Sequence, residues 1–246
     1  EVRANGATLT GAVCVNLLRH PAWGRAQETY GEDPFQVGEM GAAITRGLQQ
    51  SVMACVKHFA CNSMENARFS VDVTVDDVAL HEVYLPHFKR IVDEGVASVM
   101  SAYNAVNGEW CGQSHQLLRE VLREEWGFEG YVVSDWILGL RDAAVSVTAG
   151  LDIEMPYRML RAQHLPGALE RGELSWGDID ACAERVISTL LRFDHVLFGE
   201  VPDSSVVGSD EHRALAREAA ARSVVVVKNA TVGDSPALPI SPQTSV

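Results

Sequence analysis

Asp135 is the residue whose type and position most favour chemistry. It follows an apolar run at residues 131–133, and Trp136 comes directly after it. A short β-branched and aromatic run bounded by glycines predicts a buried strand. In a parallel α/β barrel the carboxyl ends of the strands open onto the face that carries the chemistry. A carboxylate held there can attack an anomeric carbon, and an indole can stack on a sugar ring. The alternative is that Asp135 caps a following helix.

Polar side chains follow two further apolar runs in the same way. Lys57 and His58 follow residues 51–56, and Tyr103 follows residues 96–100. The carboxyl ends of parallel strands meet at one edge, so we expect these side chains near Asp135. A cation there would stabilise the charged carboxylate, and the tyrosine could donate to the same group. In a different class of enzyme, a lyase or aldolase, Lys57 would form a Schiff base with a carbonyl substrate.

The elements that must position these residues alternate between strand and helix. Apolar runs predict strands at residues 7–16, 51–56, 96–100, 131–134 and 151–155. Helical spacing falls at residues 37–50, 77–94, 114–126, 139–149, 159–171 and 176–197. This alternation is typical of a parallel sheet, and a closed eight-unit barrel takes about 250 residues. The sequence therefore predicts an α/β fold, a partial (β/α)8 TIM-type barrel lacking its N-terminal strands. An open five-stranded sheet is the alternative.

The pattern changes after residue 199. We interpret residues 1–199 as an incomplete barrel domain and residues 200–222, which include a helix at 210–222, as a linker. Residues 223–229 read as a strand, and residues 223–246 as the beginning of a second, C-terminal domain. We expect the chain to be a piece of a longer protein.

Composition narrows the classes of partner. The net charge of −13 argues against binding to nucleic acid or to an anionic membrane. No apolar run approaches the ~18 residues needed to span a bilayer. The five cysteines are widely spaced without a CxxC pair, so we expect buried free thiols and no metal site. Such thiols are typical of a reducing compartment such as the cytoplasm. The localisation is otherwise unassigned, because any signal peptide would precede residue 1.

Four motifs in order carry a family resemblance. They are Arg19-x-Pro21-x-Trp23-Gly24-Arg25 with Gly-Glu-Asp-Pro at 31–34, Val-Lys-His-Phe-Ala at 56–60, Ser-Ala-Tyr-Asn at 101–104, and Ser-Asp-Trp at 134–136 with Gly-Leu-Asp at 150–152. Across residues 1–229 the chain resembles glycoside hydrolase family 3. It is closest to the β-glucosidase branch, whose loop after the Lys-His pair is similar to residues 62–68. The residues directly after the Lys-His pair, Phe59-Ala60-Cys61-Asn62, lack the glycines of the N-acetylglucosaminidase branch.

The resemblance implies a role for each matching residue. Asp135 matches the catalytic nucleophile, Trp136 matches an aromatic residue lining the sugar subsites, and Tyr103 matches the tyrosine near the nucleophile. The residues that match hydrogen-bonding partners of the sugar hydroxyls are Arg25, Lys57, His58 and Arg68. The resemblance also places the acid/base residue in a second, α/β sandwich domain beyond Val246, and a sugar-binding aspartate before Glu1.

Each of these residues also has a structural interpretation. Arg25 could pair with Glu28 or Glu32, Arg68 could be solvated surface, and Tyr103 and Trp136 could pack as core. Lys57 and His58 could likewise be structural or exposed. Glu154 ends a predicted strand on the same face and is a weaker candidate for the pocket lining.

The implied function is that of an exo-acting, retaining β-glycosidase, a β-glucosidase that releases non-reducing-end glucose from a β-linked glycoside or oligosaccharide. It requires no metal or organic cofactor. The alternatives are a β-xylosidase of the same family, since the contacts to C6 are not fixed by the motifs, and a non-catalytic sugar-binding remnant. We expect residues 1–246 alone to show little or no activity. The oligomeric state is unassigned.

Overall fold

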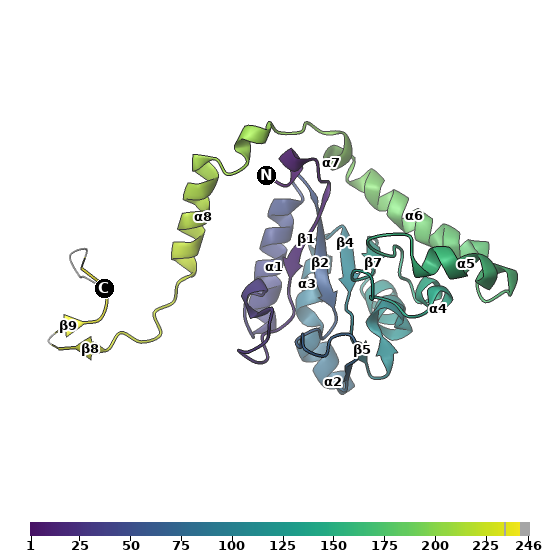
Figure 1. Cartoon of the computed structure of the whole chain (residues 1–246), viewed down its shortest axis with the longest axis horizontal. Coiled ribbons are helices and arrows are strands. Elements are labelled where there is room, and N and C mark those ends of the chain that lie inside the picture. The colour runs from purple at the N-terminus through teal and green to yellow at the C-terminus, as the bar shows by residue number, and fades with distance from the viewer. Residues whose placement is uncertain (234, 242–246) are drawn as a thin grey trace. The chain divides into compact units, whose positions relative to one another are not determined.

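The structure is a computed structural model that describes residues 1–233 and 235–241 (Figure 1). The chain divides into two compact units, Val2–Val201 and Glu1 together with Pro202–Val246. The first unit carries the sheet and the pocket. The second contains α8 (Asp210–Ser223) and a short antiparallel hairpin of β8 (Thr231–Val232) and β9 (Ser235–Pro236).

A four-stranded parallel sheet forms the centre of the first unit. Its strands are β1 (Leu9–Cys14), β2 (Met53–Phe59), β4 (Ser98–Ser101) and β7 (Tyr131–Val133), and they pair in that order. An isolated parallel bridge from Val133 to Ile153 continues the series. The order never reverses, which distinguishes it from a doubly wound sheet and matches the wall of a β/α barrel. Among the described residues this wall does not close, so the fold is a partial barrel.

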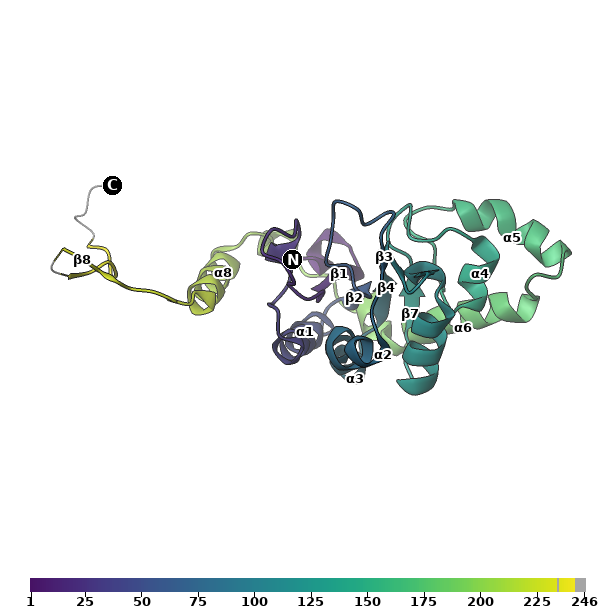
Figure 2. The ribbon, with the colours of Figure 1, turned by 90° about the horizontal axis from the view of Figure 1, so that it is seen from below.

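Helices connect successive strands and cover one face of this wall. Figures 1 and 2 show α1 and α3 side by side along it. The connections are α1 (Pro34–Leu48) between β1 and β2; α2 (Asp77–Ala79), the π-helical Leu80–Tyr84 and α3 (Pro86–Asp93) between β2 and β4; and the π-helical Gln116–Glu125 between β4 and β7. Beyond β7 follow α4 (Ala143–Thr148), α5 (Leu160–Glu170), α6 (Trp176–Arg192) and α7 (Asp194–Phe198).

Side-chain alternation along the strands separates two apolar layers. Val56, Val99 and Val132 face the helices and join the main core with Phe88 and Ile91 of α3. Their neighbours along the strands point the other way and form a smaller cluster, made by Cys55, Met100, Tyr131 and Val133. This period of two is what a strand buried on both faces requires. The barrel wall is therefore covered by helices on one side and lined by apolar side chains on the other.

A small second sheet braces the loops at the carboxyl ends of the strands. It pairs β3 (Asp72–Val73) with β5 (Ala105–Val106) and β5 with β6 (Glu109–Trp110). β3 lies in the polar stretch of residues 61–76. The composition of this stretch hides the strand, because a two-residue strand has no measurable period.

Two predicted strands do not form as expected. Residues 151–155 contribute the single bridge at Ile153 in place of a strand. The prediction of a strand at 223–229 is wrong, because Ser223 is the last residue of α8 and residues 224–229 form no strand. Valines favour strands only where a neighbouring strand takes up their backbone hydrogen bonds, and no described strand pairs with residues 224–227. Where the linker and second domain begin stays a prediction.

Candidate active site

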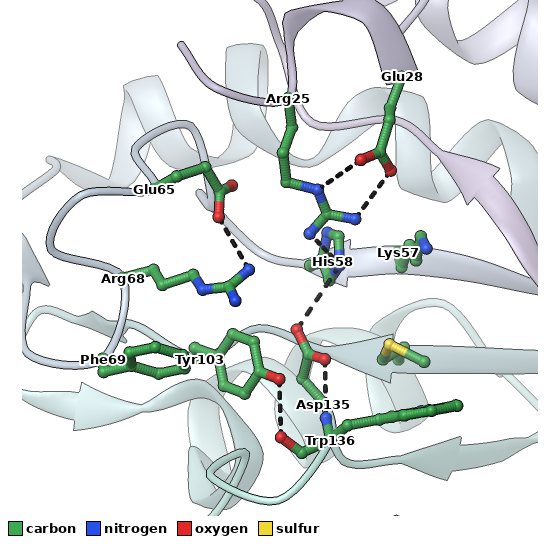
Figure 3. Close-up of a pocket in the computed structure, with 11 residues that line it drawn as sticks. Arg25, Glu28, Lys57, His58, Glu65, Arg68, Phe69, Tyr103, Asp135 and Trp136 are labelled. Atoms are coloured by element: carbon green, nitrogen blue, oxygen red, sulfur yellow. Dashed lines mark hydrogen bonds and ion pairs between the residues drawn. The ribbon is translucent and has the colours of Figure 1, made fainter.

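A pocket of about 630 Å³ opens at the carboxyl ends of β2, β4 and β7 (Figure 3). Its size is typical of a small-molecule site. All seven residues singled out from the sequence line it: Arg25, Lys57, His58, Arg68, Tyr103, Asp135 and Trp136. Four further residues complete the lining: Glu28, Glu65, Phe69 and Met100. The parallel direction of the strands explains this convergence, because residues more than a hundred positions apart follow strand ends at one edge.

Asp135 lies two residues beyond β7, and its side chain is almost fully buried. Its Oδ1 accepts a hydrogen bond from the Trp136 amide at 2.7 Å, whereas its buried Oδ2 has no hydrogen-bond partner among the described residues. Burial raises the pKa of the carboxyl, opposed by the Trp136 amide, Tyr103, Arg25 and Arg68. The neighbouring cations thus act in the expected direction, but burial outweighs them. The capping interpretation does not hold, because Asp142 caps α4.

His58 forms the floor of the pocket and is uncharged. Its Nδ1 lies 3.1 Å from Oδ1 of Asn16, and its Nε2 lies 2.8 Å from Nη1 of Arg25. Since a guanidinium can only donate, Nε2 must accept and the ring proton belongs on Nδ1. Burial, with Arg25, Lys57 and Arg68 nearby, holds the pKa of His58 well below its usual range. The 3.6 Å contact between Nε2 and Oδ2 of Asp135 therefore joins a neutral ring to a carboxylate.

Asn16 is a residue of this site that the sequence interpretation missed. It is buried, its Nδ2 donates to the His58 carbonyl at 2.8 Å, and its Oδ1 accepts from the His58 amide at 2.9 Å. Asn16 ends the first predicted strand, residues 7–16, just as Lys57 and Asp135 follow later apolar runs. This shared position at the end of an apolar run is the signal by which the sequence could have identified Asn16.

Arg25 both lines the pocket and forms the ion pair considered from the sequence. Its Nε and Nη2 donate to the two carboxylate oxygens of Glu28 at 2.9 and 2.8 Å. Arg25 holds the pKa of Glu28 below its usual value, so this glutamate is ionised. A two-pronged bond of this kind fixes the plane of the guanidinium. The remaining Nη1 points to His58.

Tyr103 and Trp136 form the side of the pocket nearest the carboxylate. The Tyr103 hydroxyl donates to the Trp136 carbonyl at 2.7 Å, and it also lies close enough to Asp135 to lower the pKa of that carboxyl. Burial and the neighbouring Asp135 raise the pKa of Tyr103 to about 12. The Trp136 side chain is 53% exposed, which excludes the core interpretation. The chain turns sharply after Asp135, where Gly139 packs against the Asp135 backbone.

Lys57 lies near the end of β2, half-buried, and faces the pocket. No hydrogen-bond or ion-pair partner is found for its ammonium group among the described residues. Arg25 and Arg68, by contrast, are each paired with a glutamate. Within the described pocket Lys57 is therefore the cation most available to a ligand.

Glu154 lies outside this pocket. Its carboxylate accepts from the amides of Leu160 and Arg161 at 2.8 and 3.0 Å, and so satisfies the first turn of α5. Over residues 1–233 and 235–241, no cluster of three His, Cys, Asp or Glu side chains could hold a metal ion. All five cysteines are buried free thiols, as expected. None of the described helices has the length and hydropathy to cross a membrane.

The fold and the pocket define a β/α-barrel protein with a carboxylate-centred site at its strand ends. The chain belongs to glycosyl hydrolase family 3: residues 1–189 match the Glycosyl hydrolase family 3 N terminal domain. It is 36% identical over 233 residues to beta-glucosidase B of Emericella nidulans, covering 93% of this chain and 28% of that protein. It is also 36% identical, over 217 residues, to an exo-alpha-(1->6)-L-arabinopyranosidase of Bifidobacterium breve, covering 87% of this chain and 28% of that protein.

A solved structure shares the fold. Beta-glucosidase 3B of Thermotoga neapolitana in complex with glucose matches with a TM-score of 0.86 and 38% identity, covering 98% of this chain and 34% of that one. The chain thus spans about a third of the length of the relatives it matches.

Proposed function

We propose that this chain is the barrel part of an exo-acting, retaining β-glucosidase in which Asp135 is the nucleophile. The observation that carries the proposal is the buried Oδ2 of Asp135, which faces the pocket without a hydrogen-bond partner among the described residues. An unpaired carboxylate oxygen on a rigid strand end is costly to bury, and an attacking atom is one use for it. The names of the relatives, with glucose bound in one solved structure, support a glucoside as substrate.

The proposed reaction is a double displacement. Oδ2 of Asp135 bonds to the anomeric carbon while the bond to the leaving oxygen breaks, and a general acid gives that oxygen a proton. Water then attacks the same carbon and gives a proton to the residue that served as the general acid, and the bond from this carbon to Asp135 breaks. Glu28 and Glu65 are both held by arginines, so neither is placed to give up a proton. We therefore place the general acid outside these pocket residues, as the resemblance implies.

The remaining pocket residues would bind the sugar. Lys57, Arg25 and Arg68 offer N–H donors to hydroxyls, and charge-assisted bonds of this kind are directional and strong. Trp136 presents a half-exposed indole that can stack on a sugar ring. His58 has its lone pair occupied by Arg25, so we propose that it positions that arginine.

The names of the relatives do not fix the identity of the sugar, because a relative with a different named specificity matches at the same 36% identity. A β-xylosidase differs at the space around C6, and a sugar-binding remnant would bind product without turnover. Relative rates of labelling by gluco- and xylo-configured reagents distinguish a β-glucosidase from a β-xylosidase. Binding of glucose without any labelling supports the sugar-binding remnant.

The test is covalent trapping. A 2-deoxy-2-fluoro-β-glucoside with an activated leaving group should add one fluoroglucosyl unit to the 246-residue chain, and peptide mass spectrometry should locate it on Asp135. The Asp135→Ala variant should not be labelled, because the attacking atom is gone. The matched control is Asp93→Ala, which removes an exposed aspartate paired with Lys89 and should leave labelling intact. Label on another carboxylate would overturn the assignment.

A further inference from the structure

Glu65 uses both of its carboxylate oxygens to join two loops of the pocket. Its Oε1 accepts from the indole Nε1 of Trp23 at 3.1 Å, and its Oε2 accepts from Nη1 of Arg68 at 3.0 Å. Trp23 is buried in the loop between β1 and α1, whereas Glu65 and Arg68 lie in the loop after β2. Glu65 is thus a bridge between segments about forty residues apart.

Arg68 is held on a second side by aromatic rings. Its guanidinium lies 4.7 Å from the ring centre of Phe69 and 4.9 Å from that of Tyr103. Figure 3 shows the side chain extended between Glu65 and Tyr103. These contacts leave part of the guanidinium facing the pocket that it lines. Cation–π contacts orient a cation without consuming its hydrogen-bond donors.

Glu65 keeps Arg68 from pairing with Asp135, as the other charged groups of the pocket indicate. Asp135 faces His58, Tyr103, Lys57, Arg25 and Arg68, and its Oδ2 has no hydrogen-bond partner among the described residues. Asp135 is the carboxylate of the described pocket that has no arginine partner, so a guanidinium released from Glu65 would be free to pair with it. A two-pronged bond there would occupy the oxygen that must attack the sugar. Arg25 cannot take this course, because Glu28 and His58 hold it.

We propose that Glu65 is a positioning residue that keeps Arg68 on the pocket wall, available to a sugar hydroxyl and off the Asp135 nucleophile. The part of this proposal that concerns the sugar hydroxyl and the nucleophile rests on the proposed glycosidase function. Glu65 itself accepts from two N–H donors, so it acts through Arg68 and not by proton transfer.

The first experiment needs no sugar. In NMR spectra of the 246-residue chain, the guanidinium N–H signals of Arg68 should show restricted rotation, and the Trp23 indole N–H should be protected from exchange. Both should be lost in Glu65→Ala, and the Trp23 signal should be kept in Glu65→Gln, which retains an acceptor. Restricted Arg68 signals in Glu65→Ala at unchanged shifts would overturn the positioning role.

The second experiment measures the second-order rate of labelling by the fluoroglucoside. Glu65→Ala should lower this rate at least tenfold, and Glu65→Gln should recover part of it. The acid limb of its pH profile should move to lower pH, since Arg68 would then pair with Asp135. In an Arg68→Ala background, Glu65→Ala should have no further effect. The matched control is Glu173→Ala, which breaks a two-pronged exposed pair with Arg171 far from these residues and should label normally.

The outcomes are separable. An equal loss in both backgrounds with an unmoved acid limb would show a structural tie and overturn the inference, as would wild-type labelling of Glu65→Ala. No labelling of the wild-type chain would contradict the proposed function, while the NMR experiment would still decide whether Glu65 positions Arg68.

Discussion

At the scale of single residues, the pocket is organised by what each cation is already bound to. Arg25 is held by Glu28 and His58, and Arg68 by Glu65, while Lys57 has no such partner among the described residues. The bound arginines are oriented donors. The lysine ammonium is the donor that has no protein partner among the described residues and is free to bind a ligand.

We expect Lys57→Ala to lower the second-order rate of labelling by about 10- to 100-fold. Removing one partner of a charge-assisted hydrogen bond costs about 1.5–3 kcal/mol, and this loss appears directly in that rate. The measurement is the labelling rate by intact-mass spectrometry. Lys89→Ala, which removes an exposed lysine of α3, is the control. A rate within twofold of wild type would mean that the sugar lies elsewhere.

The fall of the labelling rate at low pH, the acid limb of its pH profile, should report the ionisation of Asp135. Its pKa is raised by burial and lowered by Tyr103, and only the ionised form attacks. Labelling should therefore fail as the pH drops through this raised pKa. In Tyr103→Phe one of the groups that lower the pKa is gone, so the limb should move to higher pH. A limb that stays in place or moves down would contradict this account of the electrostatics.

At the scale of elements, the turn after β7 decides where Asp135 points. A Cβ at Gly139 would overlap the Asp135 carbonyl oxygen and lie 2.6 Å from its amide nitrogen. A Cβ at Gly112 would in turn overlap the Gly139 carbonyl oxygen. The carboxylate is thus aimed by two close backbone approaches that glycine alone permits.

Gly139→Ala should lower the labelling rate by about 100-fold, because a displacement near 1 Å at a reacting group has this effect. Overpacking should also cost about 1–3 kcal/mol in the free energy of unfolding. The control is Gly47→Ala in α1, where an added Cβ meets no atom within 4 Å. It should stabilise the helix by about 0.5–1 kcal/mol and label normally. Chemical denaturation and labelling rates measure both effects, and equal labelling of the two variants would refute the argument.

At the scale of the whole molecule, the described pocket offers the proposed nucleophile, Asp135, without a free proton donor. Its other carboxylates, Glu28 and Glu65, are both paired with arginines. The sheet behind it is a barrel wall whose first strand, β1, and last bridge, at Ile153, are edges among the described residues. Exposed edges favour association between chains.

The rate at which the 246-residue chain cleaves a glycoside should therefore depend strongly on the leaving group. A general acid contributes about 10²–10⁴-fold, and a dinitrophenolate leaves without one whereas glucose does not. We expect slow release from an activated aryl β-glucoside and no steady-state hydrolysis of cellobiose, both followed by product release over time. Full turnover of cellobiose would show that a carboxylate of this chain is the acid, and loss of that turnover in Glu65→Gln or Glu28→Gln would identify it.

The sequence by itself determined which residues meet. Lys57, Tyr103 and Asp135 each follow or end an apolar run, and parallel strands bring such ends to one edge whatever lies between them. The order of the strands in the sheet agrees with their order along the chain, since βα connections place consecutive strands side by side. The tertiary structure alone decided what those residues bind. Glu65 joins Trp23 to Arg68, Arg25 and Asn16 set the tautomer of His58, and the Tyr103 hydroxyl donates to the Trp136 carbonyl. These choices depend on distances between loops far apart in the sequence, which a local pattern does not encode. The unpaired valines of residues 224–227 show the same limit, because their pattern indicates a strand but a strand exists only beside a partner.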